Sequence, residues 1–241
     1  MILWGVLLVV LLVFIYYTVL LRNEKMSKAI SDCEKIVIHK ISYGSGPKIG
    51  LIGGVHGNEP AGAAALSEII SGKWNLPKRG EYVIIPEANK CGLLKSSRYQ
   101  DTFTHRDLNR NFSESGPLDY NSQVVLSAFS NCDYIIDIHE GYAFHKQTPE
   151  SVGSTLTSTP GMDTIAATAV SSINATITEP WRKFTHLHED CDIRGTLSCL
   201  SLLNNRNYVL IEVTGQNDIQ PLSLRVNQIK FLINNMLHQI Y

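Results

Sequence analysis

Residues 47–71, PKIGLIGGVHGNEPAGAAALSEIIS, predict a strand, a glycine-rich turn and a helix in direct succession. The apolar run 47–55 ends in glycines and a valine, which is typical of a buried strand before a tight turn. Pro60 then stands at the tolerated first turn of a helix, and good helix formers follow it. Because a strand and a helix alternate within this one segment, it predicts the start of an α/β fold.

Further apolar runs repeat the pattern along the chain. Residues 82–89, 132–140 and 207–215 are continuous apolar segments with β-branched residues, which favour strands that are covered on both faces. Residues 35–41 alternate like a strand, and residues 222–241 have the spacing of an amphipathic helix. We therefore expect an α/β three-layer sandwich with a mixed, mostly parallel central sheet.

The composition is that of an ordered globular protein. The chain has 241 residues, 44% of them hydrophobic, and a formal net charge of −1. No basic surface is indicated, so nucleic acid is not an expected partner. The 5 cysteines are odd in number and lack a tight spacing pattern, which predicts reduced thiols in a reducing compartment.

The first 21 residues contain no charged side chain, and a helix of that length matches a hydrocarbon layer of about 30 Å. This segment predicts a transmembrane anchor at residues 1–21, followed by a linker at 22–34 and a catalytic domain at 35–241. A cleaved signal peptide is the alternative, but a basic start and a small-residue cleavage site are missing.

Basic residues follow the apolar segment and none precedes it. Arg22, Lys25 and Lys28 therefore predict, by the positive-inside rule, a single-pass membrane protein whose catalytic domain faces the cytoplasm. Two glycosylation-type triplets, at Asn111 and Asn174, would favour a lumenal domain instead.

Polar residues cluster where three of the predicted strands end. In α/β sheets, ligands collect at this edge. His56 and Glu59 alone are weak evidence, since the chain has 8 histidines. A catalytic zinc site needs three ligands of the His, Asp or Glu type, and His139 is the best third ligand. Asp137 lies two residues before His139, so both side chains are expected on the same face of the strand. The alternative for His139 is a core histidine satisfied by hydrogen bonds.

The remaining histidines are expected to have structural roles, although one pair has strand-like spacing that could hold a metal ion. The six are His39, His105, His145, His186, His188 and His238, and the pair is His186 with His188.

Glu212 lies within an apolar run, 208–215, where a glutamate is costly unless it is paired or catalytic. Burial raises the pKa of a carboxyl group toward the range of a general base, and the alternative is a strand-end glutamate that reaches solvent. Residues 105–112, HRDLNRNF, offer Asn109 and Arg110 as a clamp for an anionic end of a substrate. The alternative there is a charged surface turn.

Taken in order, GGVHGNEPAG, RDLNRNF, DIHEGY and IEVTG resemble motifs of the zinc carboxypeptidase superfamily, most closely its succinylglutamate desuccinylase/aspartoacylase branch. The resemblance runs from about Pro47 to Glu212. It implies that His56, Glu59 and His139 bind Zn²⁺ and that Glu212 is the general base and acid.

The same resemblance implies roles for the residues before and within RDLNRNF. Asn109 and Arg110 correspond to the pair that binds the carboxylate of the substrate. Arg98 corresponds to the arginine that polarises the scissile carbonyl, with Arg106 as a rival for that role. Asp107 corresponds to the carboxylate that orients the first zinc histidine.

Some family features are missing. Between His139 and Glu212 no tyrosine matches the one that commonly closes over the substrate, because Tyr142 lies too near His139. The residues after Glu212 are expected to form only one helix, so the resemblance does not extend to the extra C-terminal domain of the aspartoacylases. Residues 144–161 are expected to line the cleft and to help set specificity.

The predicted function is a membrane-anchored, zinc-dependent amide hydrolase of the metallocarboxypeptidase type. It would cleave a C-terminal peptide bond or the acyl group of an N-acyl amino acid, on a peptide or small molecule with a free carboxylate. The alternative is a non-catalytic, membrane-tethered module that binds carboxylate-bearing ligands. A serine hydrolase is not indicated, because no G-x-S-x-G motif occurs.

Overall fold

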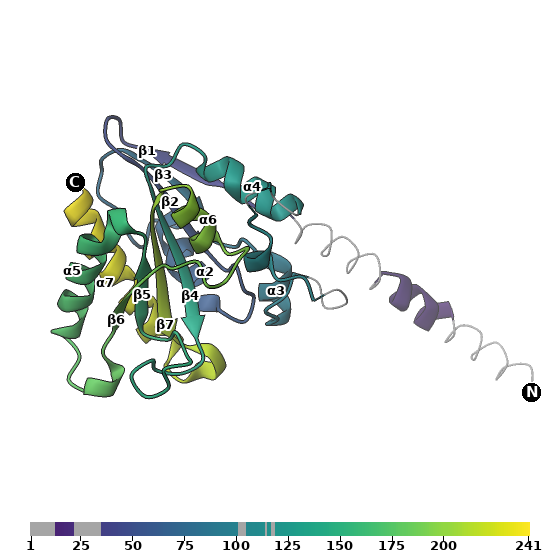
Figure 1. Cartoon of the computed structure of the whole chain (residues 1–241). Helices are drawn as coiled ribbons and strands as arrows, with labels where there is room; N and C mark the ends of the chain where they lie inside the picture. The colour runs from purple at the N-terminus through teal and green to yellow at the C-terminus, as the bar shows by residue number, and fades with distance from the viewer. Residues whose placement is uncertain (1–12, 22–34, 101–104, 114, 117–118) are drawn as a thin grey trace, which may run out of the picture. The chain divides into compact units, whose positions relative to one another are not determined.

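The computed structural model describes residues 13–21, 35–100, 105–113, 115–116 and 119–241. The chain divides into two compact units, Met1–Lys35 and Ile36–Tyr241. In the first unit, residues 13–21 form a helix with exposed side chains (Figure 1).

The predicted membrane location is wrong. Among the residues that the structure describes, no helix has both the length and the apolar character needed to cross a membrane. This overturns the prediction of a single-pass protein held in the lipid bilayer by residues 1–21 with its domain facing the cytoplasm. Residues 1–12 of that segment and the linker residues 22–34 lie outside the described part.

The second unit contains a seven-stranded mixed sheet with the order β1-β3-β2-β4-β7-β5-β6 (Figure 1). The strands are β1 (His39–Ser42), β2 (Lys48–Gly53), β3 (Glu81–Ile85), β4 (Tyr134–Gly141), β5 (Thr155–Ser158), β6 (Thr185–His188) and β7 (Asn207–Thr214). Strands β3, β2, β4 and β7 are parallel. β1 is antiparallel to β3, and β5 is antiparallel to β7 but parallel to β6. The predicted α/β fold with a mixed, mostly parallel sheet is confirmed.

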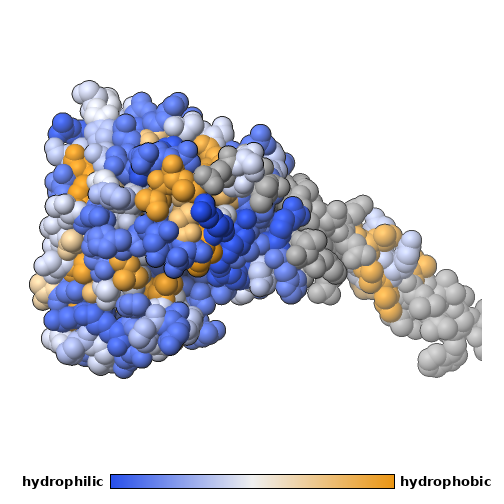
Figure 2. Space-filling model, viewed as in Figure 1, coloured by the Kyte–Doolittle hydropathy of each residue, from blue (hydrophilic) through white to orange (hydrophobic). Residues whose placement is uncertain are grey.

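Helices pack against both faces of the sheet. The helices are α2 (Pro60–Ile70), α3 (Lys90–Lys95), α4 (Tyr120–Phe129), α5 (Asp163–Asn174), α6 (Leu197–Leu203) and α7 (Leu222–Ile240). Short 3₁₀ turns are η1 (Leu108–Arg110), η2 (Pro160–Met162), η3 (Pro180–Arg182) and η4 (Gln216–Asp218). One apolar core joins the sheet to α2, α5 and α7, and a second joins it to α4 and α6. The visible surface of this unit is mainly hydrophilic, with scattered apolar patches (Figure 2).

The sequence predicted the central strands but missed two short ones. β5 lies inside residues 144–161, which were expected to form a loop, and β6 follows a polar turn. Each strand has only four residues, which is too short to show a clear alternation of apolar and polar side chains. β1 begins at His39, later than the predicted start at residue 35.

Candidate metal centre and active site

Three polar side chains meet at the carboxyl end of the parallel strands. His56 lies in the turn after β2, Glu59 is the residue before α2, and His139 is in β4. The parallel pairing of β2 with β4 sets Gly53 opposite Ile138, so the turn that carries His56 lies beside His139. The three residues are 3%, 2% and 2% exposed. Their burial means that each polar group needs a partner within the protein or a bound ion.

The atoms of this cluster have the spacing of metal ligands. His56 Nδ1 lies 2.9 Å from Glu59 Oε1, His139 Nδ1 lies 3.0 Å from Glu59 Oε2, and the two Nδ1 atoms are 3.0 Å apart. Two ligands of a tetrahedral zinc ion at its usual bond lengths are separated by about 3.4 Å. Two imidazole nitrogens and a carboxylate converging on one point can therefore hold a metal ion.

A carboxylate stands behind each histidine. His56 Nε2 lies 3.1 Å from Asp107 Oδ1, and His139 Nε2 lies 3.2 Å from Asp137 Oδ1. The angles between His139 and Asp137 do not suit a hydrogen bond. Tyr208 donates its hydroxyl hydrogen to Asp137 Oδ2 at 2.8 Å. Such carboxylates fix the orientation of a ligating ring and leave Nδ1 directed at the metal.

Burial and charge act on these groups in opposite directions. Burial alone would raise the pKa of Glu59, but the charges of His56 and His139 outweigh it and lower the pKa. The pKa of Asp107 is likewise lowered, because His56 and Arg98 outweigh its burial. For His139, burial lowers the pKa, but Asp137 and Glu59 raise it well above its usual value. The lowered pKa values keep the carboxylates of Glu59 and Asp107 in the ionised form that interacts favourably with a cation.

Glu212 faces the cluster from the neighbouring strand. In the parallel pairing of β4 and β7, its Cα is the partner of His139. The side chain is buried, with 7% of the residue exposed, and its Oε2 atom has no hydrogen-bond partner. Burial, reinforced by the charges of Glu59 and Asp137, raises the pKa of Glu212 well above its usual value, although His139 opposes this. Glu212 therefore does not reach solvent at a strand end.

Of the two arginines considered for the carbonyl, only Arg98 is tied to the cluster among the described contacts. Its Nε donates to Asp107 Oδ2 at 3.0 Å, and its Nη1 lies 3.7 Å from Glu59 Oε1. The side chain of Arg106 is exposed. Its backbone carbonyl oxygen accepts a hydrogen bond from the N–H of Gln100.

Asn109 and Arg110 lie in η1, directly after Asp107. Asn109 is 9% exposed, and its Oδ1 accepts the backbone N–H of Leu197 at 3.0 Å. Arg110 is exposed, and its Nη1 donates to the carbonyl oxygen of Asn109 at 2.6 Å. Arg110 also lines a cavity of about 260 Å³ together with Phe112 and other residues of this region. The guanidinium of Arg110 thus borders a hollow that could take an anionic group.

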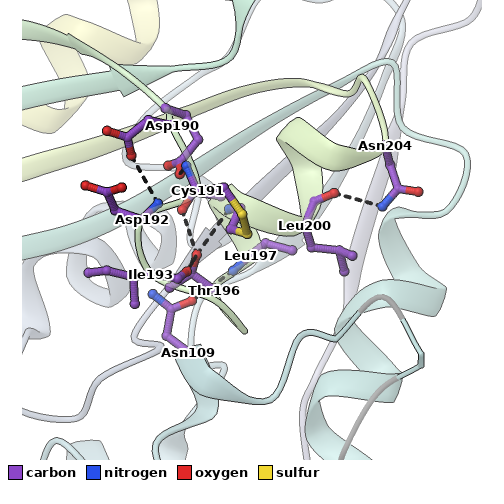
Figure 3. The surroundings of a disulfide bond; sticks show 12 residues. Asn109, Asp190, Cys191, Asp192, Ile193, Thr196, Leu197, Leu200 and Asn204 are labelled. Carbon is purple, nitrogen blue, oxygen red and sulfur yellow. Dashed lines mark hydrogen bonds between the residues drawn. A yellow bond between two sulfur atoms is a disulfide. The ribbon is translucent and has the colours of Figure 1, made fainter.

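A disulfide holds the loop that supports Asn109 (Figure 3). Cys191 and Cys199 are bonded, with their Cα atoms 4.4 Å apart. Between them, Leu197 donates to Asn109, and the carbonyl oxygen of Gly195 accepts the N–H of Phe112 at 3.0 Å.

The prediction of reduced thiols is wrong for this pair. The cysteines are 8 residues apart, a spacing with no recognisable pattern, and the turn before α6 brings them together. Disulfides persist in oxidising compartments, so the cysteines no longer support a cytoplasmic domain. Cys132 is a buried free thiol.

Sequence reasoning missed a polar network beneath Glu59. Gln216 donates through Nε2 to Glu59 Oε1 at 2.9 Å and to the Glu140 carbonyl oxygen at 2.6 Å. The Glu140 N–H donates to Glu59 Oε2, and its carboxylate accepts the N–H of Ala61 and a hydrogen from Arg225 Nη1. Nothing local in the sequence marks Gln216 or Arg225, since their partners are 157 and 85 residues away.

The glycines in the turn after β2 are required for steric reasons. A Cβ atom on Gly57 would overlap the backbone of Gly92 in α3, so only glycine lets the turn approach that helix. Gly54 has φ +62°, a backbone conformation that side chains disfavour.

Two other features singled out by the sequence are Tyr142 and residues 144–161. Tyr142 is 46% exposed. Of residues 144–161, Phe144 and Gln147 line a cavity of about 530 Å³ with Trp181, and residues 155–158 form β5 instead of a loop.

Comparison with known proteins agrees with this geometry. Residues 45–178, more than half of the chain, match the model of the succinylglutamate desuccinylase/aspartoacylase catalytic domain. The match contains His56, Glu59 and His139 and ends before Glu212. No curated protein sequence matches the chain.

Solved structures share the fold at low sequence identity. A Gln46His variant of the cell shape determinant protein Csd4 from Helicobacter pylori has a TM-score of 0.71 at 19% identity, covering 85% of this chain and 55% of that one. A succinylglutamate desuccinylase/aspartoacylase from Rhodobacter sphaeroides has a TM-score of 0.59 at 21% identity, covering 85% and 58%. The ectoine utilization protein EutE (DoeB) from Ruegeria pomeroyi has 0.59 at 18%, covering 84% and 60%.

The chain therefore spans less than two thirds of the length of these proteins. The family match nevertheless confirms the resemblance that the motifs predicted. The chain belongs to the family of succinylglutamate desuccinylase/aspartoacylase catalytic domains.

Proposed function

We propose that this protein is a zinc-dependent amide hydrolase that acts on substrates with a free carboxylate. The substrate is a peptide cleaved at its C-terminal bond or an N-acyl amino acid cleaved at its acyl group. The family membership supports hydrolysis. The observation that carries the proposal is the buried carboxyl of Glu212 beside the His56, Glu59 and His139 cluster, with an oxygen that lacks a partner.

Zinc is the metal that this donor set fits best. Two imidazole nitrogens and one carboxylate are the usual ligands of a catalytic zinc, and three protein ligands leave a fourth position open. We assign His56, Glu59 and His139 as these ligands, and Asp107 and Asp137 as the carboxylates that orient the two rings. A zinc ion bound here supplies Lewis acidity and lowers the pKa of a bound water to about 7.

Glu212 is the proposed general base and acid. Its raised pKa, caused by burial and by Glu59 and Asp137, matches a group that must both take and return a proton near neutral pH. Glu212 accepts the proton of the attacking water and then delivers it to the leaving nitrogen. The carboxylate of Glu212 is thereby restored for the next turnover.

Arginines and an asparagine are proposed to hold the substrate. Arg98 is the better candidate for polarising the scissile carbonyl, since its guanidinium contacts Asp107 and approaches Glu59. Asn109 and Arg110 anchor the carboxylate, which fixes the amide over the metal. Arg106 is set aside from this role because its side chain points to solvent.

The ligands of similar structures point to the same substrate class. Csd4, described as a D,L-carboxypeptidase, has been solved with a tripeptide and with mDAP bound, and EutE (DoeB) with its product. We propose that residues 35–241 form the catalytic domain, in accord with the compact unit Ile36–Tyr241.

Glu212→Gln tests the proposal. This variant should retain one equivalent of zinc in the cluster and lose hydrolysis by a factor of at least 100, the scale of general acid–base catalysis. Glu81→Gln, at an exposed glutamate of β3, is the matched control and should leave both unchanged. The substrate panel compares peptides with free C-termini against N-acyl aspartates and glutamates. Full activity of Glu212→Gln would reject the mechanism, and zinc binding without turnover on the whole panel would favour a non-catalytic binding module.

A further inference from the structure

A second group of metal-ligating side chains lies away from the catalytic cluster. Asp163 begins α5, and His186 and His188 lie in β6. Because residues two apart in a strand share a face, both rings point to the same side of the sheet, toward Asp163. Each of the three residues offers one ligand atom, and these atoms lie within 4.8 Å of one another.

The distances around Asp163 suit a shared cation. His188 Nδ1 lies 3.1 Å from Asp163 Oδ2, and His186 Nε2 lies 3.7 Å from Asp163 Oδ1. These values bracket the separation of about 3.4 Å between two ligands of a tetrahedral zinc ion. The centroids of the two imidazole rings are 4.8 Å apart. The side chain of His188 is exposed, so its ring is free to rotate toward an ion held by Asp163 and His186.

Asp163 is oriented by the buried strand beside it. Ser158, the last residue of β5, has 0% exposure and donates its hydroxyl hydrogen to Asp163 Oδ1 at 2.6 Å. The same hydroxyl lies 2.7 Å from His186 Nε2.

This group is separate from the active site. β5 runs antiparallel to β7, with Thr155 opposite Glu212 and Ser158 opposite Val209. At about 3.3 Å per residue, Ser158 lies about 10 Å from Thr155 along β5, in the direction that leads away from Glu212. The two ligand groups cannot share one ion.

We propose that Asp163, His186 and His188 form a second, structural site for a divalent metal ion of the zinc type. Two imidazoles and one carboxylate are the donors that zinc accepts, and such an ion would join the edge strand β6 to helix α5. Joining them would stabilise an edge strand of only four residues, the kind of element that opens easily.

Zinc stoichiometry tests the proposal. At saturating Zn²⁺ after dialysis, elemental analysis should give one zinc fewer per chain for His188→Gln than for the unmodified protein. His188 has a side chain that is 71% exposed, so this variant should fold. His238→Gln, an exposed histidine on α7, is the matched control and should lose no zinc. Asp163→Asn should reproduce the loss.

A second measurement separates this site from the catalytic one. In a His56→Ala/His139→Ala variant, added Zn²⁺ should still raise the melting temperature, because a ligand that binds only the folded state stabilises it. Adding His188→Gln to that variant should remove the rise. Equal zinc content in His188→Gln and the unmodified protein, or a rise that survives the added substitution, would overturn the second site and leave the proposed hydrolase intact.

Discussion

Replacing Arg225 with methionine removes the positive partner of a buried ion pair. Arg225 is 1% exposed, its Nη1 lies 2.5 Å from Glu140 Oε2, and Glu140 is also 1% exposed. In the variant, the Glu140 carboxylate keeps only the N–H of Ala61 as a described partner. Breaking a buried pair in this way costs about 3–5 kcal/mol, because a charge remains buried without compensation.

That cost is large for this domain. A typical domain is stable by about 5–15 kcal/mol, so at least about a fifth of the stability would be lost. For a unit of the size of Ile36–Tyr241, each kcal/mol corresponds to about 2–4 °C, which predicts a melting temperature lower by about 6–20 °C.

Urea unfolding followed by circular dichroism measures the effect. Arg182→Met is the matched control, since its ion pair with Glu179 is partly exposed and should contribute about 1 kcal/mol or less. In the double variant Arg225→Met/Glu140→Gln, the buried charge is gone, so the loss should be smaller than the sum of the two single losses. A loss below about 1 kcal/mol for Arg225→Met, or strict additivity in the double variant, would refute the reasoning.

Three further predictions concern the metal site and the free thiol. Asp107→Asn should weaken zinc binding by about 10–100-fold in a chelator competition, since the carboxylate behind His56 is lost; unchanged affinity would contradict this role. Gly57→Ala should lower the zinc content of purified protein, because the added methyl group meets the backbone of Gly92; full zinc occupancy would show that the turn tolerates the shift. Burial raises the pKa of the Cys132 thiol to about 11, so the thiolate fraction at pH 8 falls about 100-fold and alkylation, followed by mass spectrometry, should be slow until the protein unfolds. Equal alkylation rates in folded and unfolded protein would argue against that burial.

The sequence was most informative where a pattern is local. The apolar runs that became β2, β4 and β7 are long enough to show strand character, and parallel strands bring their carboxyl ends to one edge. That rule alone predicted that His56, Glu59, His139 and Glu212 would lie together. The motif order then supplied the family.

Features that depend on distant partners or on environment were not predictable. Arg225 and Gln216 look like ordinary surface residues until the fold brings them to Glu140 and Glu59. The disulfide joins cysteines whose spacing has no pattern, and it forms only because of the turn before α6. The apolar composition of residues 1–21 predicted a membrane helix, whereas no helix among the described residues is long and apolar enough to cross a membrane.

The disulfide between Cys191 and Cys199 also affects how preparations of this protein should be handled. Thiol reagents in purification buffers would open the loop whose Leu197 N–H holds Asn109, while His56, Glu59 and His139 contain no sulfur and keep their arrangement. If Asn109 binds the carboxylate of the substrate as proposed, a reduced sample would bind zinc as before but bind that carboxylate less tightly. Michaelis constants measured with and without dithiothreitol would describe two different forms of one protein.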